Sequence, residues 1–513
     1  MTEQKTSTFG IFLSPSLRFP RFFLKKKKKQ TFGDGICGRM FSIAHELGYY
    51  RSVAVTGIYS SRLGKVDLEK KLDASVQAAI REHPALCYGL SDQTTDDGLT
   101  IFASFKEIHR DDLIEVINYS SESPSEDISG SAADNVLRQR LEKAHTSFWP
   151  VGKPAWRLIA IHHPAEKSLL GEAAHSDSET LEERRFDIAF VFHHAIADGL
   201  SGLAFHNAIM KHFSLISDAS SEVKWPLAVD WSVSLPNLVE DRIDLNNPQR
   251  SESEQSPTQG DQPTWPGDII SLPAGNVYRS RVHLTIVPPE TLSSSLKFCK
   301  SQGITLTGYL HGLICVFLSR EVMEAPGFRL VTPYSLRQFT KTSAHDIAFH
   351  AASMAIYIPG SDLATMRKTE PQSSEEREHV IKIAKKFSES MAREVAASSY
   401  IDELRDVPDA IEFRKSALGI LGKRRTKSYE ISNLGVGQNP TANPDAKPMV
   451  LRRLMMTQSG SVTGHAFSVN CASVRGGPLT LSITWSNGVV EDELIKSLSL
   501  YLKRSMERLP KGE

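Results

Sequence analysis

The stretch FDIAFVFHHAIADG, residues 186–199, decides the fold of this chain. Every second residue from Phe186 to Phe192 is large and apolar, which predicts a strand with one apolar face. Ala189 and Val191 lie between them and are apolar as well, so we expect both faces of the strand to be buried. The strand runs directly into His193 and His194, and Asp198-Gly199 follow. A buried strand that ends in two histidines is the first candidate for chemistry in the chain.

Periodic stretches on both sides of this strand predict a mixed α/β fold. Apolar residues recur at spacings of three and four over 66–83, a pattern typical of a helix packed on a core, and the apolar stretch 306–318 predicts a second, long helix. Strands alternating with helices indicate sheets flanked by helices. Further expected strands cover 51–60, 156–162, 277–286, 329–333, 347–358, 468–474 and 479–485, and further expected helices cover 39–47, 202–213, 290–301, 375–397 and 491–509.

The length of 513 residues and the composition along the chain favour two lobes joined by a linker. We expect residues 1–34 to form a disordered tail and residues 35–216 to form an N-terminal lobe that holds the histidine motif. Residues 217–275 are rich in Pro, Ser, Asp, Glu and Gln and are expected to be a crossover linker. Residues 276–513 are then the C-terminal lobe.

Charge and cysteine content exclude several classes of protein. Sixty Lys+Arg balance sixty Asp+Glu, so the chain lacks the basic excess expected of a nucleic-acid-binding protein. The five cysteines are isolated, which argues against a disulfide framework or a structural zinc site and favours a reducing compartment. We therefore expect a cytoplasmic protein, and a monomer.

The N-terminal stretch has two interpretations. No window of the sequence reaches the length of uninterrupted apolar residues that a membrane-spanning helix needs. Aromatic residues between Phe9 and Leu24, followed by five lysines at 25–29, are compatible with weak association with an anionic lipid surface. The alternative is a disordered tail that does not join the folded protein.

The histidine motif can be interpreted from its own geometry. Successive side chains of a strand point to opposite faces, so His193 and His194 cannot both enter one cavity. A neutral histidine can remove a proton from an alcohol. Asp198 lies where the strand should give way to a helix, and its simplest role is that of a helix N-cap. Gly199 allows the close approach of a substrate or a sharp turn.

Other catalytic signatures are absent from the sequence. It contains no GxSxG, GxGxxG after a strand or GxxxxGK[ST], so a serine hydrolase, a dinucleotide-dependent oxidoreductase and a P-loop enzyme have no support. We expect His162-His163 to be exposed at a strand end, and His311 to belong to a core or line a channel. Neither site has further ligands at metal spacing, so we expect no metal.

The motif HHxxxDG, here His193 to Gly199, resembles the active-site signature of the chloramphenicol acetyltransferase-like superfamily, which includes peptide-synthetase condensation domains. Within it the chain is most similar to the fungal alcohol acetyltransferase family. The similarity covers nearly the whole chain from about residue 39. Softer similarities support it in RMFSIAHELGYYRSVAV (39–55), TLTGYLHGLICVF (305–317), PYSLR (333–337) and SNLG (432–435). The DFGWG motif of related plant enzymes is absent, and SNLG lies roughly where it is expected.

The resemblance implies roles for individual residues. It implies that His194, the second histidine, is the general base, and that Asp198 points away from the substrate and pairs with an arginine, for which Arg337 is the candidate. It also implies two lobes of the chloramphenicol acetyltransferase type, with a channel between them. Lys423, Arg424 and Arg425 are candidates for contact with the phosphates of coenzyme A, although a solvated loop is the simpler interpretation.

We expect an acyl-CoA-dependent O-acyltransferase that transfers acetyl from acetyl-CoA to a hydrophobic alcohol, without a covalent acyl-enzyme. No permanently bound cofactor is expected, and acetyl-CoA or another acyl-CoA acts as co-substrate. One alternative is a condensation-like acyltransferase that takes its acyl group from a carrier protein. The other is a catalytically silent binding protein of the same fold.

Overall fold

The computed structural model describes residues 35–96, 98–119, 131–166, 183–216, 223–229, 237–245, 262–266, 270–271, 278–398, 400–439, 449–508 and 510. All of them belong to one compact unit, Thr31–Glu513. The predicted tail at 1–34 lies outside the described residues, and so do residues 246–261 of the predicted linker.

The sheet that carries the histidine motif contains β1 (Val53–Ser61), β5 (Ile114–Asn118), β6 (Trp156–Glu166), β7 (Glu183–Phe192) and β13 (Met449–Gln458). The strand order is β13-β1-β7-β6-β5, and every neighbouring pair is antiparallel except β5–β6. The motif strand β7 is therefore central. Its residues from Phe186 to Phe192 are all buried, as the apolar run predicts.

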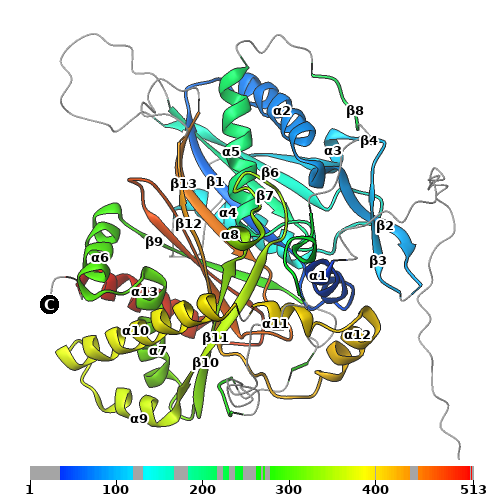
Figure 1. The fold of residues 1–513 in the computed structure, drawn as a ribbon. Helices are drawn as coiled ribbons and strands as arrows, with labels where there is room; N and C mark the ends of the chain where they lie inside the picture. The colour runs from blue at the N-terminus through cyan, green and yellow to red at the C-terminus, as the bar shows by residue number, and fades with distance from the viewer. Residues whose placement is uncertain are drawn as a thin grey trace, which may run out of the picture. The chain divides into compact units, whose positions relative to one another are not determined.

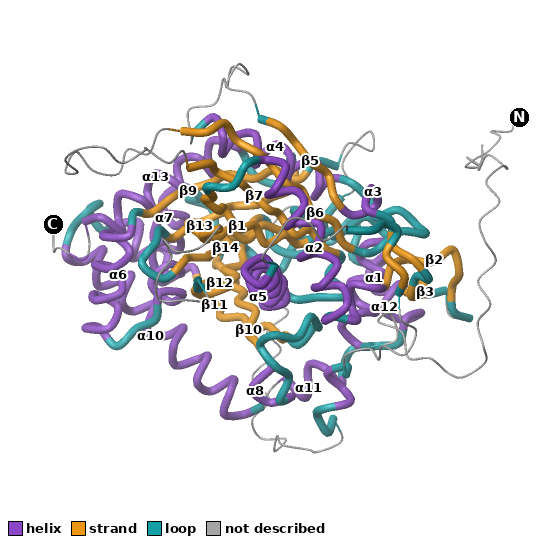
Figure 2. Tube along the Cα trace, turned by 90° about the horizontal axis from the view of Figure 1, so that it is seen from above, coloured by secondary structure: helices purple, strands orange, loops and turns teal. Residues whose placement is uncertain are grey.

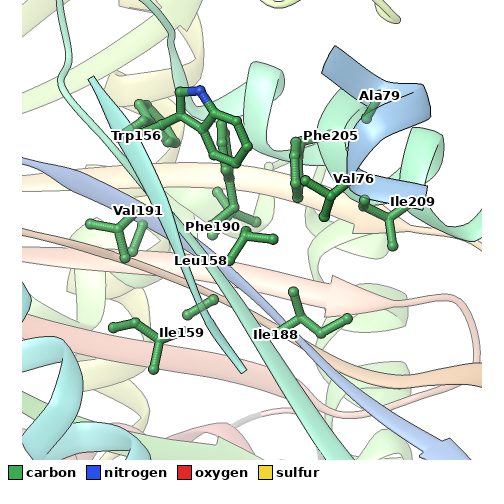
Figure 3. Packing of buried hydrophobic residues seen from close by; sticks show 14 of the residues in the cluster. Val76, Ala79, Trp156, Leu158, Ile159, Ile188, Phe190, Val191, Phe205 and Ile209 are labelled. Carbon is green, nitrogen blue, oxygen red and sulfur yellow. The ribbon is translucent and has the colours of Figure 1, made fainter. Parts of the chain in front are cut away.

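Two helices, α2 (Lys65–Glu82) and α5 (Gly199–Leu215), pack side by side over this sheet (Figure 1). Trp156, Phe190 and Phe205 form the aromatic centre between sheet and helices, with ring centroids of the two phenylalanines 4.0 Å apart (Figure 3). Val76 and Ala79 from α2 lie against the same cluster. The predicted spacing of apolar residues over 66–83 thus places one face of α2 in the core.

The second sheet contains β9 (Ser280–Val287), β10 (Gly327–Ser335), β11 (Ala351–Pro359), β12 (Tyr429–Gly437), β14 (Phe467–Val474) and β15 (Leu479–Ser486). Its order is β11-β10-β12-β14-β15-β9, with parallel pairs at β10–β12 and β12–β14. Helices α6 (Pro289–Gln302), α7 (Leu306–Glu321), α9 (Gly360–Lys368), α10 (Ser374–Ala397) and α13 (Asp492–Arg508) lie together beside this sheet (Figure 1).

Helix α7 is almost entirely buried and is covered by α10. Gly308 and Gly312 face α10, where an added Cβ would meet the main chain at Ala384 and Val380. These glycines therefore permit the close approach of the two helices.

The described residues contain further helices and strands. They are α1 (Ile36–Glu46), β2 (Tyr88–Thr94), β3 (Thr100–Ser104), β4 (Glu107–Ile108), α3 (Arg110–Leu113), α4 (Ala132–Thr146), β8 (Leu227–Ala228), α8 (Arg337–Thr340), α11 (Tyr400–Arg405), α12 (Ala410–Gly419) and two 3₁₀ turns at Pro84–Cys87 and Val239–Asp241.

The sheets do not follow the predicted ranges of the two lobes. Strand β13 falls within 276–513, yet it pairs with β1 along its whole length, from Val53 opposite Gln458 to Ser61 opposite Met449. The chain thus returns to the first sheet after it has begun the second. Helix α5 contacts β1 and β13 of the first sheet and β12 of the second, and Figure 2 looks along it.

The described parts of the predicted linker, 217–275, do more than connect. Strand β8 pairs with β4, and the Glu240 carboxylate accepts a hydrogen bond from the main-chain N–H of Ile36 at 2.9 Å. Trp265 forms a bridge with Phe328 of β10. These residues of the predicted linker therefore also pair with and bond to other parts of the chain.

None of the described helices is by itself long and apolar enough to cross a membrane. The pair α6–α7 reaches that length and composition only when both helices are taken together, and it is bent by 97°.

Candidate active site

The HHxxxDG motif joins the end of β7 to the start of α5. His193 is 1% exposed and packs against the rings of His45 and Phe102, whereas His194 keeps part of its surface exposed. The two neighbours therefore have different surroundings, as expected for successive residues at a strand end. Burial holds the pKa of His193 well below its usual value, so this ring is neutral.

His194 has one fixed ring nitrogen. Its Nδ1 lies 2.8 Å from the main-chain oxygen of Ala197. Because a carbonyl oxygen can only accept, Nδ1 carries the hydrogen and Nε2 has a free lone pair. Burial lowers the pKa of His194, while the bond to Ala197 and the nearby charges of Asp198 and Glu430 oppose that shift. The arrangement gives a neutral imidazole with Nε2 available as a proton acceptor.

Aromatic rings from two distant parts of the chain surround His194. Its ring centroid lies 4.1 Å from that of Phe41, 4.9 Å from that of Phe349 and 5.7 Å from that of Tyr50. All four side chains keep part of their surface exposed. They therefore present a largely apolar, partly exposed surface beside the histidine, which suits contact with an apolar ligand.

Asp198 caps helix α5. Its Oδ1 accepts hydrogen bonds from the main-chain N–H and the hydroxyl of Ser201, both at 2.8 Å, and the Ser201 hydroxyl lies 3.2 Å from the Asp198 N–H. This reciprocal capping box satisfies N–H groups that a helix start leaves without partners. The capping role expected from the sequence is confirmed.

The structure brings Asp198 and Arg337 together. Nη2 of Arg337 donates to Oδ1 of Asp198 at 3.0 Å and to the main-chain oxygen of Ala348 at 3.1 Å. The main-chain N–H of His350 donates to Oδ2 at 3.1 Å. The pair expected from the resemblance is thus present, and it ties the segment between α8 and β11 to the start of α5. That it supports catalysis stays a prediction.

Gly199 is the first residue of α5. A Cβ there would lie 3.3 Å from Leu434 Cδ1 and 3.4 Å from Met456. Strands β12 and β13 therefore pack closely on the helix start, and the missing side chain gives room for that contact.

SNLG, residues 432–435, forms part of β12. The Asn433 amide donates to the Thr307 hydroxyl at 3.0 Å, and Gly435 has a φ of 87° at a bulge opposite β14. Ser432 faces Met456, with its hydroxyl 3.8 Å from the thioether sulfur. The segment thus links β12 both to α7 and to β13.

The structure contradicts the expected exposure of two further histidines and agrees with the expected place of a third. His162 and His163 are 7% and 6% exposed, so the expectation of exposure is wrong. Strand β6 continues past both histidines and ends at Glu166. Within it, His163 Nε2 lies 2.9 Å from the Asp187 carboxylate. His311 is fully buried in the second core and its Nε2 lies 2.7 Å from the Thr332 hydroxyl, in agreement with one of the two expected roles.

The basic candidates for coenzyme A have unequal exposure. Lys423 and Arg424 are exposed, while Arg425 is 4% exposed and donates to the main-chain oxygen of Gly464 at 3.2 Å. Phosphate binding by this loop stays a prediction. Over the ranges that the structure describes, no group of three or more His, Cys, Asp or Glu side chains is placed to hold a metal ion.

A cavity of about 780 Å³ runs along the outer side of α5. It begins at Leu203, about one turn after Gly199, and reaches Lys211. Its lining also includes His83, whose Nε2 is buried without a hydrogen-bond partner, and Gln438 after β12. The cavity is thus lined by helices α2 and α5, which pack on the first sheet, and by the end of β12 in the second sheet.

Most residues around His194 could not be identified from the sequence. Phe41 and Tyr50 belong to the 39–55 stretch that supports the resemblance, but no local pattern connects them with the histidine motif. Phe349 and Gln458 gave no signal at all.

Comparisons with known proteins point to one family. A family model described as "Alcohol acetyltransferase" matches residues 103–504. The probable alcohol acetyltransferase FCK4 of Fusarium pseudograminearum is 23% identical over 494 residues, covering 90% of this chain and 92% of that protein. The probable alcohol acetyltransferase crmB of Aspergillus fumigatus is 24% identical over 470 residues, covering 87% and 93%.

Solved structures share the fold. The TRI3 trichothecene 15-O-acetyltransferase from Fusarium sporotrichioides matches with a TM-score of 0.66 at 13% identity, over 93% of this chain and 94% of that one. The first condensation domain of the CDA synthetase matches with a TM-score of 0.56 at 14% identity, over 92% and 94%. The predicted α/β fold of the two-lobed, chloramphenicol acetyltransferase-like kind is confirmed.

Proposed function

Because this chain belongs to the alcohol acetyltransferase family and is an acyltransferase, we propose that it transfers an acetyl group from acetyl-CoA to a hydrophobic alcohol, with His194 as general base. The observation that carries this proposal is the hydrogen bond from His194 Nδ1 to the Ala197 oxygen. It holds the imidazole in the tautomer whose Nε2 can accept a proton.

The proposed reaction is direct. His194 Nε2 accepts the hydroxyl proton as the alcohol oxygen bonds to the thioester carbonyl carbon. The carbon–sulfur bond then breaks, and the imidazolium returns the proton to the departing thiolate. The products are an acetate ester and free CoA, so atoms and charge balance without an acyl-enzyme.

An apolar acceptor is supported by the partly exposed rings beside His194. Phe41 and Phe349 offer only carbon surface there. The solved TRI3 relative is a 15-O-acetyltransferase, which is compatible with an oxygen as the acceptor atom here too.

A long, thin donor is supported by the cavity along α5. From Leu203 to Lys211, the part of α5 that lines the cavity, a helix rises about 12 Å, which is enough for part of an extended chain. We infer that the acyl-CoA arm lies in this cavity, with its acyl end toward the start of α5.

The test uses the purified full chain with acetyl-CoA and a panel of aliphatic alcohols, amines and sterols. Free thiol is followed with a chromogenic disulfide, and mass spectrometry identifies the acetylated product. We expect thiol release that depends on an alcohol, together with the matching ester. Release with amines alone, or no release with acetyl-CoA, would refute the proposal.

A further inference from the structure

A chain of hydrogen bonds beside His194 fixes the direction of the Tyr50 hydroxyl. Tyr50 stacks on His194 with a centroid distance of 5.7 Å and an interplanar angle of 30°. Its hydroxyl lies 2.7 Å from Oε1 of Gln458, the last residue of β13. Burial and the nearby charge of Glu430 raise the pKa of the Tyr50 hydroxyl well above its usual value, so the phenol keeps its proton.

The amide of Gln458 can point only one way. Its Nε2 donates at 2.9 Å to the Glu430 carboxylate and at 2.9 Å to Oδ1 of Asn470. The Glu430 carboxylate, when ionised, can only accept. The Asn470 amide is oriented in turn, because its Nδ2 donates to the main-chain oxygen of Ser482 at 3.3 Å. The Glu430 carboxylate and the main-chain oxygen of Ser482 can only accept, so together they fix the direction of every hydrogen bond in this series.

It follows that Tyr50 donates its only hydroxyl hydrogen to Gln458. The phenol oxygen then has lone pairs but no hydrogen for a further partner. Of the four aromatic rings that lie beside His194, those of Phe41, Phe192 and Phe349 have no polar atom, so the Tyr50 oxygen is the polar atom that these rings contribute.

His194 likewise offers an atom that can accept a hydrogen bond but cannot donate one. Its Nδ1 hydrogen is committed to Ala197, so Nε2 can only accept. The stacked rings thus place two acceptor atoms, His194 Nε2 and the Tyr50 oxygen, on neighbouring side chains that keep part of their surface exposed.

We propose that the acceptor substrate is a diol or polyol, with one hydroxyl that gives its proton to His194 and a neighbouring hydroxyl that donates a hydrogen bond to Tyr50. Two donors on the substrate match two acceptors on the protein. Tyr50 is a specificity-determining residue, with its polarity set by Gln458. This inference rests on the proposed function, since it concerns the alcohol that is acetylated.

The experiment compares wild type, Tyr50→Phe and the matched control Tyr49→Phe. Tyr50→Phe keeps the ring against His194 and removes only the oxygen. Tyr49 is the chain neighbour, 3% exposed, and its hydroxyl has no hydrogen-bond partner. The probes are 1,2- and 1,3-octanediol, 1-octanol, and the 2- and 3-methoxy ethers of 1-octanol, which accept but cannot donate at the second oxygen. Initial rates with acetyl-CoA and calorimetric binding are both measured.

We expect wild type and Tyr49→Phe to favour at least one diol over 1-octanol and over the matching ether. Tyr50→Phe should lower kcat/KM and affinity for that diol roughly 2- to 10-fold, the size of one neutral hydrogen bond, and leave 1-octanol unchanged.

Three results would overturn the inference: no preference for a diol in wild type, an unchanged preference in Tyr50→Phe, or an ether that binds as well as its diol, since binding would then not need a hydrogen donated to Tyr50. If the diols bind with the expected pattern but no thiol is released, the proposed function fails while the role of Tyr50 stands.

Discussion

Arg337 and Asp198 form an ion pair across 139 positions of the chain, with 3.0 Å between Nη2 and Oδ1 and side chains only 6% and 5% exposed. Asp198 starts the helix that follows the histidine motif, and Arg337 starts α8 at the end of β10. The pair therefore couples the loop that carries His194 to the second sheet.

Removing one partner of this pair should destabilise the protein. Arg337→Met leaves a buried carboxylate without its counter-charge, which typically costs about 3–5 kcal/mol. We expect that loss in the free energy of unfolding measured with urea. Lys496→Met is the control, because its pair with Glu493 is exposed and should contribute less than about 1 kcal/mol. An Arg337→Met protein as stable as wild type would show that the pair is unimportant for the fold.

The two motif histidines should differ when each is replaced. His194→Ala is expected to lower kcat/KM by roughly 10²- to 10⁴-fold with little change in the melting temperature, because it removes the general base. His193→Ala should act mainly on stability, since that ring is buried against His45 and Phe102. Thiol release and thermal melting are measured on both. Activity that depends on His193 alone would reverse the assignment of the base.

Activity should fall on the acid side of neutrality. The base must be neutral to accept a proton, and burial lowers the pKa of His194 below its usual 6.5. The acid limb of the kcat/KM profile should therefore lie below pH 6.5, with a plateau from about pH 7 to 8. Profiles are measured with one alcohol at fixed ionic strength. An acid limb centred above pH 7 would be incompatible with this environment.

The free energy of unfolding should also fall as the pH is lowered, for a reason separate from catalysis. Burial lowers the pKa of His145 and of His311 to about 3, so the unfolded chain binds protons that the folded one does not. Stability is then fully present above pH 6.5 and is lost as the pH falls, by up to about 1.4 kcal/mol per pH unit for each such histidine. Urea unfolding at pH 7.5, 6.5 and 5.5 measures this slope. Equal stability at pH 7.5 and 5.5 would contradict it.

Helix α5 tolerates no side chain where it crosses β1. A Cβ at Gly202 would overlap the side chain of Val55. We expect Gly202→Ala to cost about 1–3 kcal/mol of stability through overpacking, and to lower activity by shifting the helix that starts at the motif. Gly419→Ala in α12 is the control, because nothing lies within 4 Å of its Cβ position. Melting temperatures that rank the two variants equally would exclude this contact.

The sequence predicted the parts of the fold that have local periodicity. Helices α2 and α7 and strand β7 appear within a few residues of their predicted limits, because one face or the whole element is apolar. Strand β13 was missed because Arg452 and Arg453 interrupt its apolar run. In the structure these arginines bond to Glu183 and Asp134, partners that no local pattern could identify.

In the candidate site, too, contacts between residues that are distant in the sequence could not be predicted from local patterns. The capping role of Asp198 follows from its place before a helix, and its pairing with Arg337 came from the resemblance. By contrast, the contact between Tyr50 and Gln458 spans 408 positions. Residues so far apart meet only through strand pairing across the sheet, and a single sequence carries no record of that pairing.

The late arrival of β13 in the first sheet has a consequence for biosynthesis. Its partner β1 leaves the ribosome roughly 400 residues earlier, since Val53 pairs with Gln458. At about 5–20 residues per second, β1 waits some 20–80 s with one edge unpaired. An unpaired apolar edge is a template for association with other chains. Newly made protein should therefore depend on a chaperone during translation, and prematurely terminated chains should aggregate through β1.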